Sequence, residues 1–214
     1  MTGKTHLAIG VAVGAAASIY YPFTFQNAAF YITVAGFSAL SADLDGPSML
    51  SSKLGKLSKL IREFTLWIGL LLAGMIVYAF FMEKSLSPIY IGAAAAVFLL
   101  GLVAKQGVIR NILVSVVGLL VMYAGYTYGM NWLIGFGLFV GWAPWLKHRG
   151  MTHTIWAVPI WGAIALGLEN QIKVDGIATV AMLGYFSHLA ADTLTPSGVK
   201  WLYPLTKKSF KIRL

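Results

Sequence analysis

Residues 64–82 read FTLWIGLLLAGMIVYAFFM, an apolar run without a single charged side chain. A helix needs about 20 predominantly apolar residues to cross the hydrocarbon core of a bilayer. The rest of the chain has the same character, because 58% of its residues are hydrophobic, only 11% are charged, and its mean hydropathy is +0.77. Soluble globular domains do not have this composition. We therefore expect an integral membrane protein.

Further apolar segments lie on both sides of this run, at about 6–21, 28–42, 88–104, 111–128, 131–146, 154–168 and 177–194. The pattern predicts an all-α, polytopic membrane helix bundle of about eight transmembrane or membrane-embedded helices. We expect one integral membrane domain over residues 1–214. Segments 6–21, 28–42 and 154–168 are short for a full span, which indicates tilt or partial insertion. The first segment also resembles a secretory signal peptide, whose cleavage would remove His6.

The distribution of Lys and Arg predicts the topology. With eight spans and both termini in the cytoplasm, every Lys and Arg except Lys84 and Lys173 lies on the cytoplasmic side. Topology therefore accounts for the net charge of +9, and we expect no nucleic-acid partner. The basic C-terminal tail, with Lys207, Lys208, Lys211 and Arg213, is predicted to contact anionic lipid headgroups.

All four histidines, and three of the aspartates, lie at the ends of apolar segments. They are His6, Asp43 and Asp45 in SADLDG, His148 and His153 in KHRGMTH, and His188 and Asp192 in SHLAAD. The predicted topology places all of them at the cytoplasmic face. Such clusters of scarce ionisable residues favour a metal site. The chain has no cysteine, so its ligands must be imidazole and oxygen.

Spacing supports this interpretation. His188 and Asp192 are four residues apart, which places both on one helix face, either as ligands or as a hydrogen bond that steadies a helix end. Asp43 and Asp45 repel each other unless a cation lies beside them. One can bind the metal while the other orients a histidine, or Asp45 can serve as a general base. Ordinary exposed aspartates are the alternative, which the helix dipole disfavours.

The loop residues have candidate roles of their own. Arg149 is a planar donor suited to a phosphate, although a positive-inside loop residue would look the same. Thr152 and Thr195 are candidate substrate contacts, with helix capping as the alternative. His6, standing alone, is the weakest candidate ligand.

Four stretches, THLAIG (5–10), DLDGP (43–47), HRGMTHT (148–154) and GYFSHLAADTLTPSGVKWLYP (184–204), resemble a known family. This is the YdjM-like family of bacterial inner-membrane-associated metal-dependent hydrolases, one member of which is regulated by LexA. The family is distantly similar to zinc-dependent phospholipases C and P1-type nucleases. The resemblance implies a bacterial inner-membrane location, a helical metal site and hydrolysis of a phosphoester. It also implies Zn²⁺, with Mn²⁺ or Mg²⁺ as alternatives, and one or two ions rather than three.

These observations together predict a hydrolase that uses a metal-activated water on a phosphoester or pyrophosphate of a membrane lipid, either a phospholipid or a polyprenyl-phosphate-linked lipid. The predicted ligands are His6, Asp43, Asp45, His148, His153, His188 and Asp192. Asp45 and Arg149 are the predicted catalytic residues, and Arg149, Thr152 and Thr195 are predicted to bind substrate. The alternatives are a metal-dependent amidase or protease, weakened by the absence of HExxH, and a non-enzymatic metal-binding protein or transporter.

Overall fold

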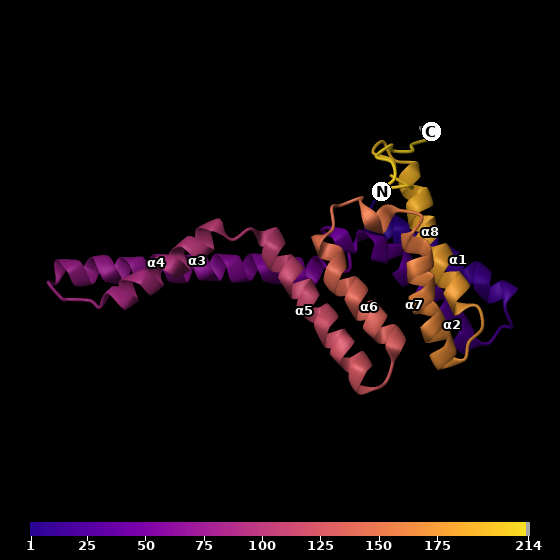
Figure 1. Ribbon diagram of the computed structural model, residues 1–214, viewed down its shortest axis with the longest axis horizontal. Helices are drawn as coiled ribbons and strands as arrows, with labels where there is room; N and C mark the ends of the chain where they lie inside the picture. Colours follow the sequence, from indigo (N-terminus) through magenta and orange to yellow (C-terminus); the bar gives the residue numbers. More distant parts are fainter. Residues whose placement is uncertain (213–214) are drawn as a thin grey trace. The chain divides into compact units, whose positions relative to one another are not determined.

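A computed structural model describes residues 1–212 and contains eight α-helices in that range (Figure 1). The described residues form no strand, only an isolated antiparallel bridge between Val199 and Phe210. The predicted all-α class is confirmed. Arg213, the last cation of the predicted basic tail, lies outside the described residues.

Each predicted apolar segment corresponds to one helix. The helices are α1 (Gly3–Tyr20), α2 (Phe25–Ser41), α3 (Ser52–Phe81), α4 (Pro88–Val103), α5 (Gln106–Thr127), α6 (Asn131–Trp142), α7 (Ala157–Ile172) and α8 (Ile177–Thr193). Three short 3-10 turns join them, η1 (Ala42–Asp45), η2 (Ala143–Trp145) and η3 (Met151–His153). The basic stretch 53–62, expected to be a loop, forms the first turns of α3, because its Lys, Leu and Arg residues are strong helix formers.

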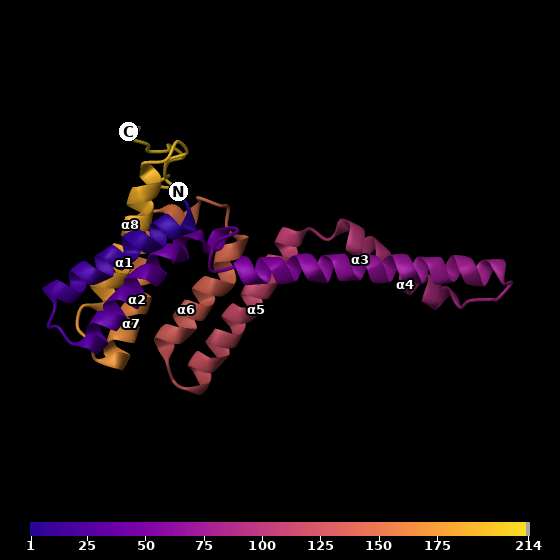
Figure 2. The same cartoon turned by 180° about the vertical axis from the view of Figure 1, so that it is seen from behind.

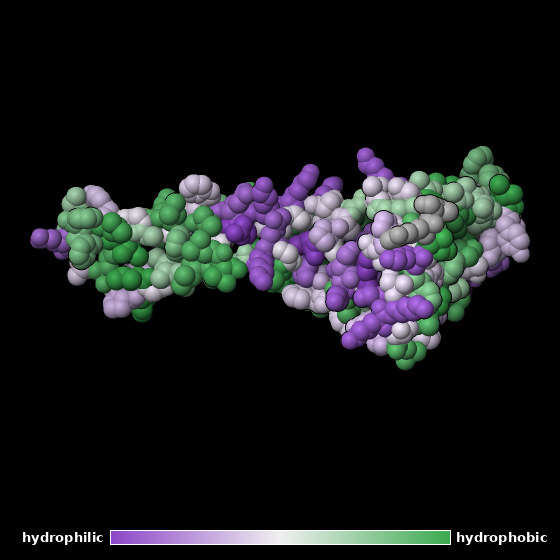
Figure 3. Space-filling model, turned by 90° about the horizontal axis from the view of Figure 1, so that it is seen from above, coloured by the Kyte–Doolittle hydropathy of each residue, from purple (hydrophilic) through white to green (hydrophobic). Residues whose placement is uncertain are grey.

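The chain forms two compact units, one of residues Ser52–Leu113 and one of Met1–Ser51 with the chain from Val114 onward. In the 52–113 unit, α3 and α4 pack closely where glycine is present. A Cβ on Gly69 would lie 2.5 Å from Phe98 Cα, and a Cβ on Gly101 would lie 2.6 Å from Leu66 Cα. The outer surfaces of the two helices are largely hydrophobic (Figure 3). Helices α3 and α5 are long and apolar enough to cross a membrane, and α4 is a shorter apolar helix.

The other unit, which we call the site unit, holds a bundle in which α2 packs against both α1 and α8 (Figure 2). Helix α7 packs on α8, and α6 on α7. Its core contains the buried aromatic residues Tyr31, Trp161 and Tyr185. The η1 turn contacts η2, η3 and α8, so three connecting segments meet at one end of the bundle. This meeting point positions the candidate site.

Candidate metal centre

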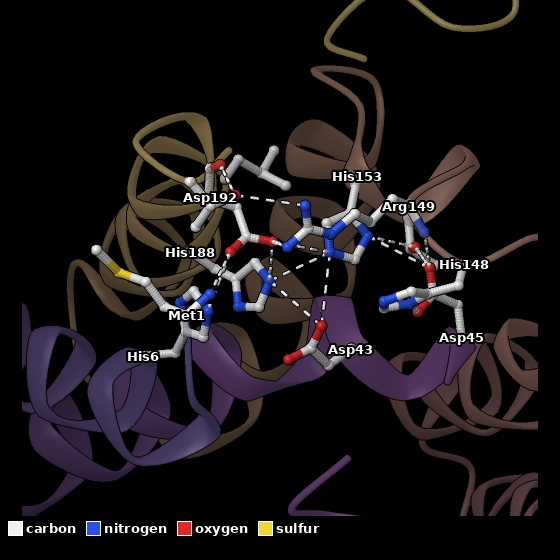
Figure 4. Close-up of polar contacts among 12 residues, drawn as sticks. Met1, His6, Asp43, Asp45, His148, Arg149, His153, His188 and Asp192 are labelled. Atoms are coloured by element: carbon white, nitrogen blue, oxygen red, sulfur yellow. Dashed lines mark hydrogen bonds and ion pairs between the residues drawn. The ribbon is translucent and has the colours of Figure 1, made fainter. Parts of the chain in front are cut away.

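The seven predicted ligands lie together at this end of the site unit (Figure 4). They come from the start of α1, the η1 turn, the loop between α6 and α7, and the last turns of α8. The set is His6, Asp43, Asp45, His148, His153, His188 and Asp192. These clusters can hold a metal ion.

Four of these side chains direct one atom each toward a common point. Nε2 of His153 lies 3.2 Å from Nε2 of His188. Oδ1 of Asp43 lies 3.6 Å from each of these nitrogens. Oδ2 of Asp192 lies 3.7 Å from the first and 3.8 Å from the second. A tetrahedral zinc ion with ordinary bond lengths holds its ligand atoms about 3.3–3.6 Å apart. The four atoms therefore fit a divalent metal without large rearrangement.

The second nitrogen of each ring determines which nitrogen is free to bind. His188 Nδ1 lies 2.7 Å from the carbonyl oxygen of Ala39, which can only accept, so this nitrogen donates. His153 Nδ1 lies 3.3 Å from Asp45 Oδ2 and 3.0 Å from the Thr152 hydroxyl. Both neutral rings then carry their lone pair on Nε2, and two lone pairs this close repel unless a proton or a cation lies between them. Metal-bound histidines have this outer hydrogen bond to a carbonyl or carboxylate.

Asp45 is buried, and both of its carboxylate oxygens are engaged. Oδ1 accepts a hydrogen bond from His148 Nδ1 at 2.7 Å. Oδ2 accepts from the backbone N–H of Arg149 at 2.9 Å and from the Thr152 hydroxyl at 2.6 Å. These contacts favour the interpretation in which Asp45 orients His153 rather than binding metal or acting as a base. The Thr152 hydroxyl is buried and is used within this network rather than presented to a substrate.

His6 and His148 occupy the two flanks of the four-atom set. The His6 ring stacks on His188 at a centroid distance of 3.8 Å, and its Nε2 lies 3.4 Å from Asp192 Oδ1. Its Nδ1 is buried without a hydrogen-bond partner among the described residues. His6, Asp43 and His188 form a further group that can hold an ion. The His148 side chain is 55% exposed and forms a pair with Asp45 at the opposite flank.

The charges of the loop groups are strongly coupled. Burial alone lowers the pKa of His153, but its bonds to Asp43 and Asp45 and their negative charges outweigh burial and raise this pKa to about 9. Burial alone raises the pKa of Asp45, but hydrogen bonds from His148, His153 and Thr152 hold it well below its usual range. In the metal-free protein the proton on His153 therefore occupies the place between the two Nε2 atoms.

Arg149 joins the loop to the end of α8. Its guanidinium lies 3.1 Å from Asp192 Oδ2 and donates to the Thr195 hydroxyl at 3.4 Å and to the Gly198 carbonyl at 3.3 Å. Its backbone is left-handed, with φ of 57°, and the bond from its N–H to Asp45 holds it there. A non-glycine residue in this conformation costs of order 1–3 kcal/mol and often marks a functional position. Thr195 also donates to the Asp192 carbonyl, so it closes α8 and contacts Arg149.

The site opens into a polar pocket of about 620 Å³. Its lining includes Lys4, Ser48, His148 and Arg149, together with His6, Asp43 and Asp192 from the cluster itself. The amino group of Met1 lies 3.3 Å from Asp192 Oδ1 at the same pocket. A pocket with cationic side chains beside a metal-binding cluster suits an anionic ligand.

The family model described as YdjM inner membrane protein matches residues 1–214. The chain belongs to this family. It is therefore an inner-membrane protein, as its motifs predicted. No curated protein and no solved structure matches the chain. The distant similarity to phospholipase C and P1 nuclease thus stays a prediction.

Sequence reasoning missed two supports of the site. Ala39 contributes only its carbonyl, and no side-chain pattern could reveal it. Tyr185 is fully buried and donates its hydroxyl to the Thr152 carbonyl at 2.7 Å, which fixes the loop from below. Its signal was present, because Tyr185 precedes His188 by three residues and so lies on the same helix face. Thr154, expected to cap α7, instead donates to the Met151 carbonyl within the loop.

Proposed function

We propose that this protein is a membrane-embedded, metal-dependent hydrolase that cleaves a phosphoester or pyrophosphate bond of a lipid. The observation that carries the proposal is the convergence of two imidazole nitrogens and two carboxylate oxygens at 3.2–3.8 Å. Outer hydrogen bonds to Ala39 and Asp45 direct both Nε2 atoms inward. The ligand set suits Zn²⁺, because imidazole and carboxylate are its usual ligands when no thiolate is present. His6 makes a second ion feasible.

The residues around the ligands supply binding and proton transfer. A bound divalent metal would lower the pKa of a water and polarise a phosphoryl oxygen. The Arg149 guanidinium can hold two phosphate oxygens in a fork, once Asp192 is neutralised from its other side. His148 donates through Nδ1 to Asp45, which leaves Nε2 as the nitrogen that accepts or returns a proton at the rim of the pocket. We therefore assign His148, rather than Asp45, to proton transfer.

A lipid substrate is favoured by the location of the site. The protein belongs to an inner-membrane family and exposes large apolar surfaces. We propose eight membrane-embedded helices with both termini and the metal centre at the cytoplasmic face, because this arrangement explains the distribution of Lys and Arg. A substrate with a polar head at this face and a tail in the bilayer then reaches the ligands without leaving the membrane.

The first experiment measures bound metal. We expect detergent-purified wild-type protein to contain near-stoichiometric zinc or manganese by mass spectrometry, and His188→Ala and His153→Ala to lose it. Asp175→Asn is the matched control, because Asp175 is the one aspartate away from the cluster. No bound metal after supplementation with divalent ions would overturn the metal-dependent mechanism.

The second experiment addresses the reaction. Metal-loaded protein is incubated with a panel of phospholipids and polyprenyl phosphates, and the release of phosphate or headgroup is measured. We expect release that requires metal and falls in Arg149→Lys, since an ammonium group cannot hold two phosphate oxygens in a fork. Stoichiometric metal without release from any lipid would favour a non-enzymatic metal-binding protein.

A further inference from the structure

Two cavities of opposite character lie on either side of the loop 146–154. The polar pocket at the metal centre contains His148 and Arg149. An apolar groove of about 180 Å³ runs between α6 and α7, and Leu146, Met151 and Thr152 of the same loop line its end. One short loop thus separates a cationic pocket from an apolar groove.

The shape of the groove suits an alkyl chain. Its walls are Gly135, Phe139 and Trp142 on α6, and Ala157, Ile160 and Ile164 on α7. The seven residues from Gly135 to Trp142 correspond to about 10 Å along a helix axis. No charged side chain lines the groove. Its small volume suits one unbranched chain better than a methyl-branched polyprenyl chain.

The neighbouring pocket specifies the head of the ligand. Lys4 and Arg149 are its cationic side chains, and its acidic side chains, Asp43 and Asp192, belong to the metal-binding cluster. A divalent ion on those carboxylates would leave an excess of positive charge. The complementary head group is an anion such as a phosphate monoester or diester.

Exposed tryptophans mark the depth at which head and chain join. Trp142, Trp145 and Trp156 are 63%, 52% and 42% exposed, and Trp142 and Trp156 line the loop end of the groove. Tryptophan is enriched at membrane–water interfaces. The groove therefore lies on the apolar side of this belt, and the pocket lies at the level of the lipid headgroups.

We propose that the α6–α7 groove binds one acyl chain of an anionic glycerophospholipid whose phosphate lies in the pocket beside Arg149. This inference rests on the proposed function, because it names the class of lipid on which the metal centre acts. The loop 146–154 would lie beneath the glycerol backbone, between phosphate and chain. The groove thus selects substrates by chain, and the pocket selects them by charge.

The test uses phosphatidic acid with a photoreactive diazirine in its acyl chain. Full-length protein in phosphatidylcholine vesicles containing this probe is irradiated, and labelled peptides are identified by mass spectrometry. Ile160→Trp fills the groove, and Leu183→Trp is the matched control, since Leu183 is 50% exposed in a different apolar pocket and Ile160 is 55% exposed. Arg149→Gln removes the head contact, and a diazirine diacylglycerol lacks the phosphate.

We expect the label to concentrate on the peptides of α6 and α7. Ile160→Trp should reduce it at least about tenfold, equivalent to 1.4 kcal/mol of binding, while Leu183→Trp leaves it unchanged. Arg149→Gln and the diacylglycerol probe should both label these peptides weakly. Label spread evenly over all exposed helices would overturn the proposal, as would equal labelling by diacylglycerol. Efficient competition by polyprenyl phosphate would overturn the choice of an acyl chain.

Cross-linking does not require turnover, so the two proposals fail separately. Labelling of the groove without hydrolysis under any metal condition would support the lipid site and contradict the hydrolase. Hydrolysis of phosphatidic acid with unchanged rates in Ile160→Trp, and without groove labelling, would support the hydrolase and contradict the groove.

Discussion

At the scale of single residues, His153 shows how the fold prepares a ligand. Its Nε2 faces the common point, and Asp45 lies behind its Nδ1. We expect Asp45→Asn to weaken zinc binding by about 10–100-fold, the usual cost of losing such an orienting partner. Asp192→Asn removes a ligand atom and should cost more. Zinc affinities measured against a competing chelator test this, with Asp175→Asn as control. Equal affinities in wild type and Asp45→Asn would contradict the orienting role.

The raised pKa of His153 predicts a pH dependence of the metal-free protein. This pKa is about 9 in the folded chain and about 6.5 in an unfolded one. Protonation of His153 therefore contributes stability that is fully present below pH about 6.5 and is lost as the pH rises to about 9. In thermal unfolding, the Tm of EDTA-treated wild type should fall across this window more than that of His153→Asn. Zinc should reverse the trend, because ligands bind metal only when deprotonated. Parallel curves for the two metal-free proteins would contradict this account.

At the scale of elements, the close approach of α1 to α2 depends on glycine. A Cβ on Gly14 would lie 2.5 Å from Ile32 Cα and 2.6 Å from the Tyr31 carbonyl oxygen. Gly14→Ala should therefore push the helices apart and cost about 1–3 kcal/mol, and metal binding should weaken as α1 carries His6 away. Gly74→Ala on α3 is the matched control, because nothing lies within 4 Å of its added Cβ. Differential scanning fluorimetry in detergent compares the two variants. A Tm for Gly14→Ala as high as that of the control would show that the contact is not tight.

The sequence predicted the elements well because each apolar segment ends at a polar cluster, such as SADLDG after α2 and SHLAAD in α8. It could not decide the role of Asp45, because that depends on the loop that brings His148 and Thr152 to its two oxygens. Nor could it reveal the Ala39 carbonyl, which reaches His188 only through the packing of α2 on α8. Local patterns thus gave the candidate ligands, whereas tertiary contacts separate ligands from the residues that orient them.

At the scale of the whole molecule, the number of membrane crossings decides where the site faces. Two arrangements compete. In the proposed eight-span arrangement, Lys84 and Lys173 lie outside, and Lys53 and Lys105 lie inside. If only α3 and α5 cross, the two helices long enough to do so, and the N-terminus is cytoplasmic, Lys84 and Lys105 lie outside and Lys173 lies inside.

The absence of cysteine makes these arrangements directly measurable. Single cysteines at positions 53, 84, 105 and 173 are treated in intact cells with a membrane-impermeant maleimide, before and after permeabilisation. The eight-span arrangement predicts labelling of Lys84→Cys and Lys173→Cys in intact cells, and of Lys53→Cys and Lys105→Cys only after permeabilisation. Labelling of Lys105→Cys but not Lys173→Cys in intact cells would instead favour two crossings. Because α7 and α8 carry the metal centre and are joined by the segment that contains Lys173, this one position decides whether these helices cross the bilayer beside their lipid or lie on its surface.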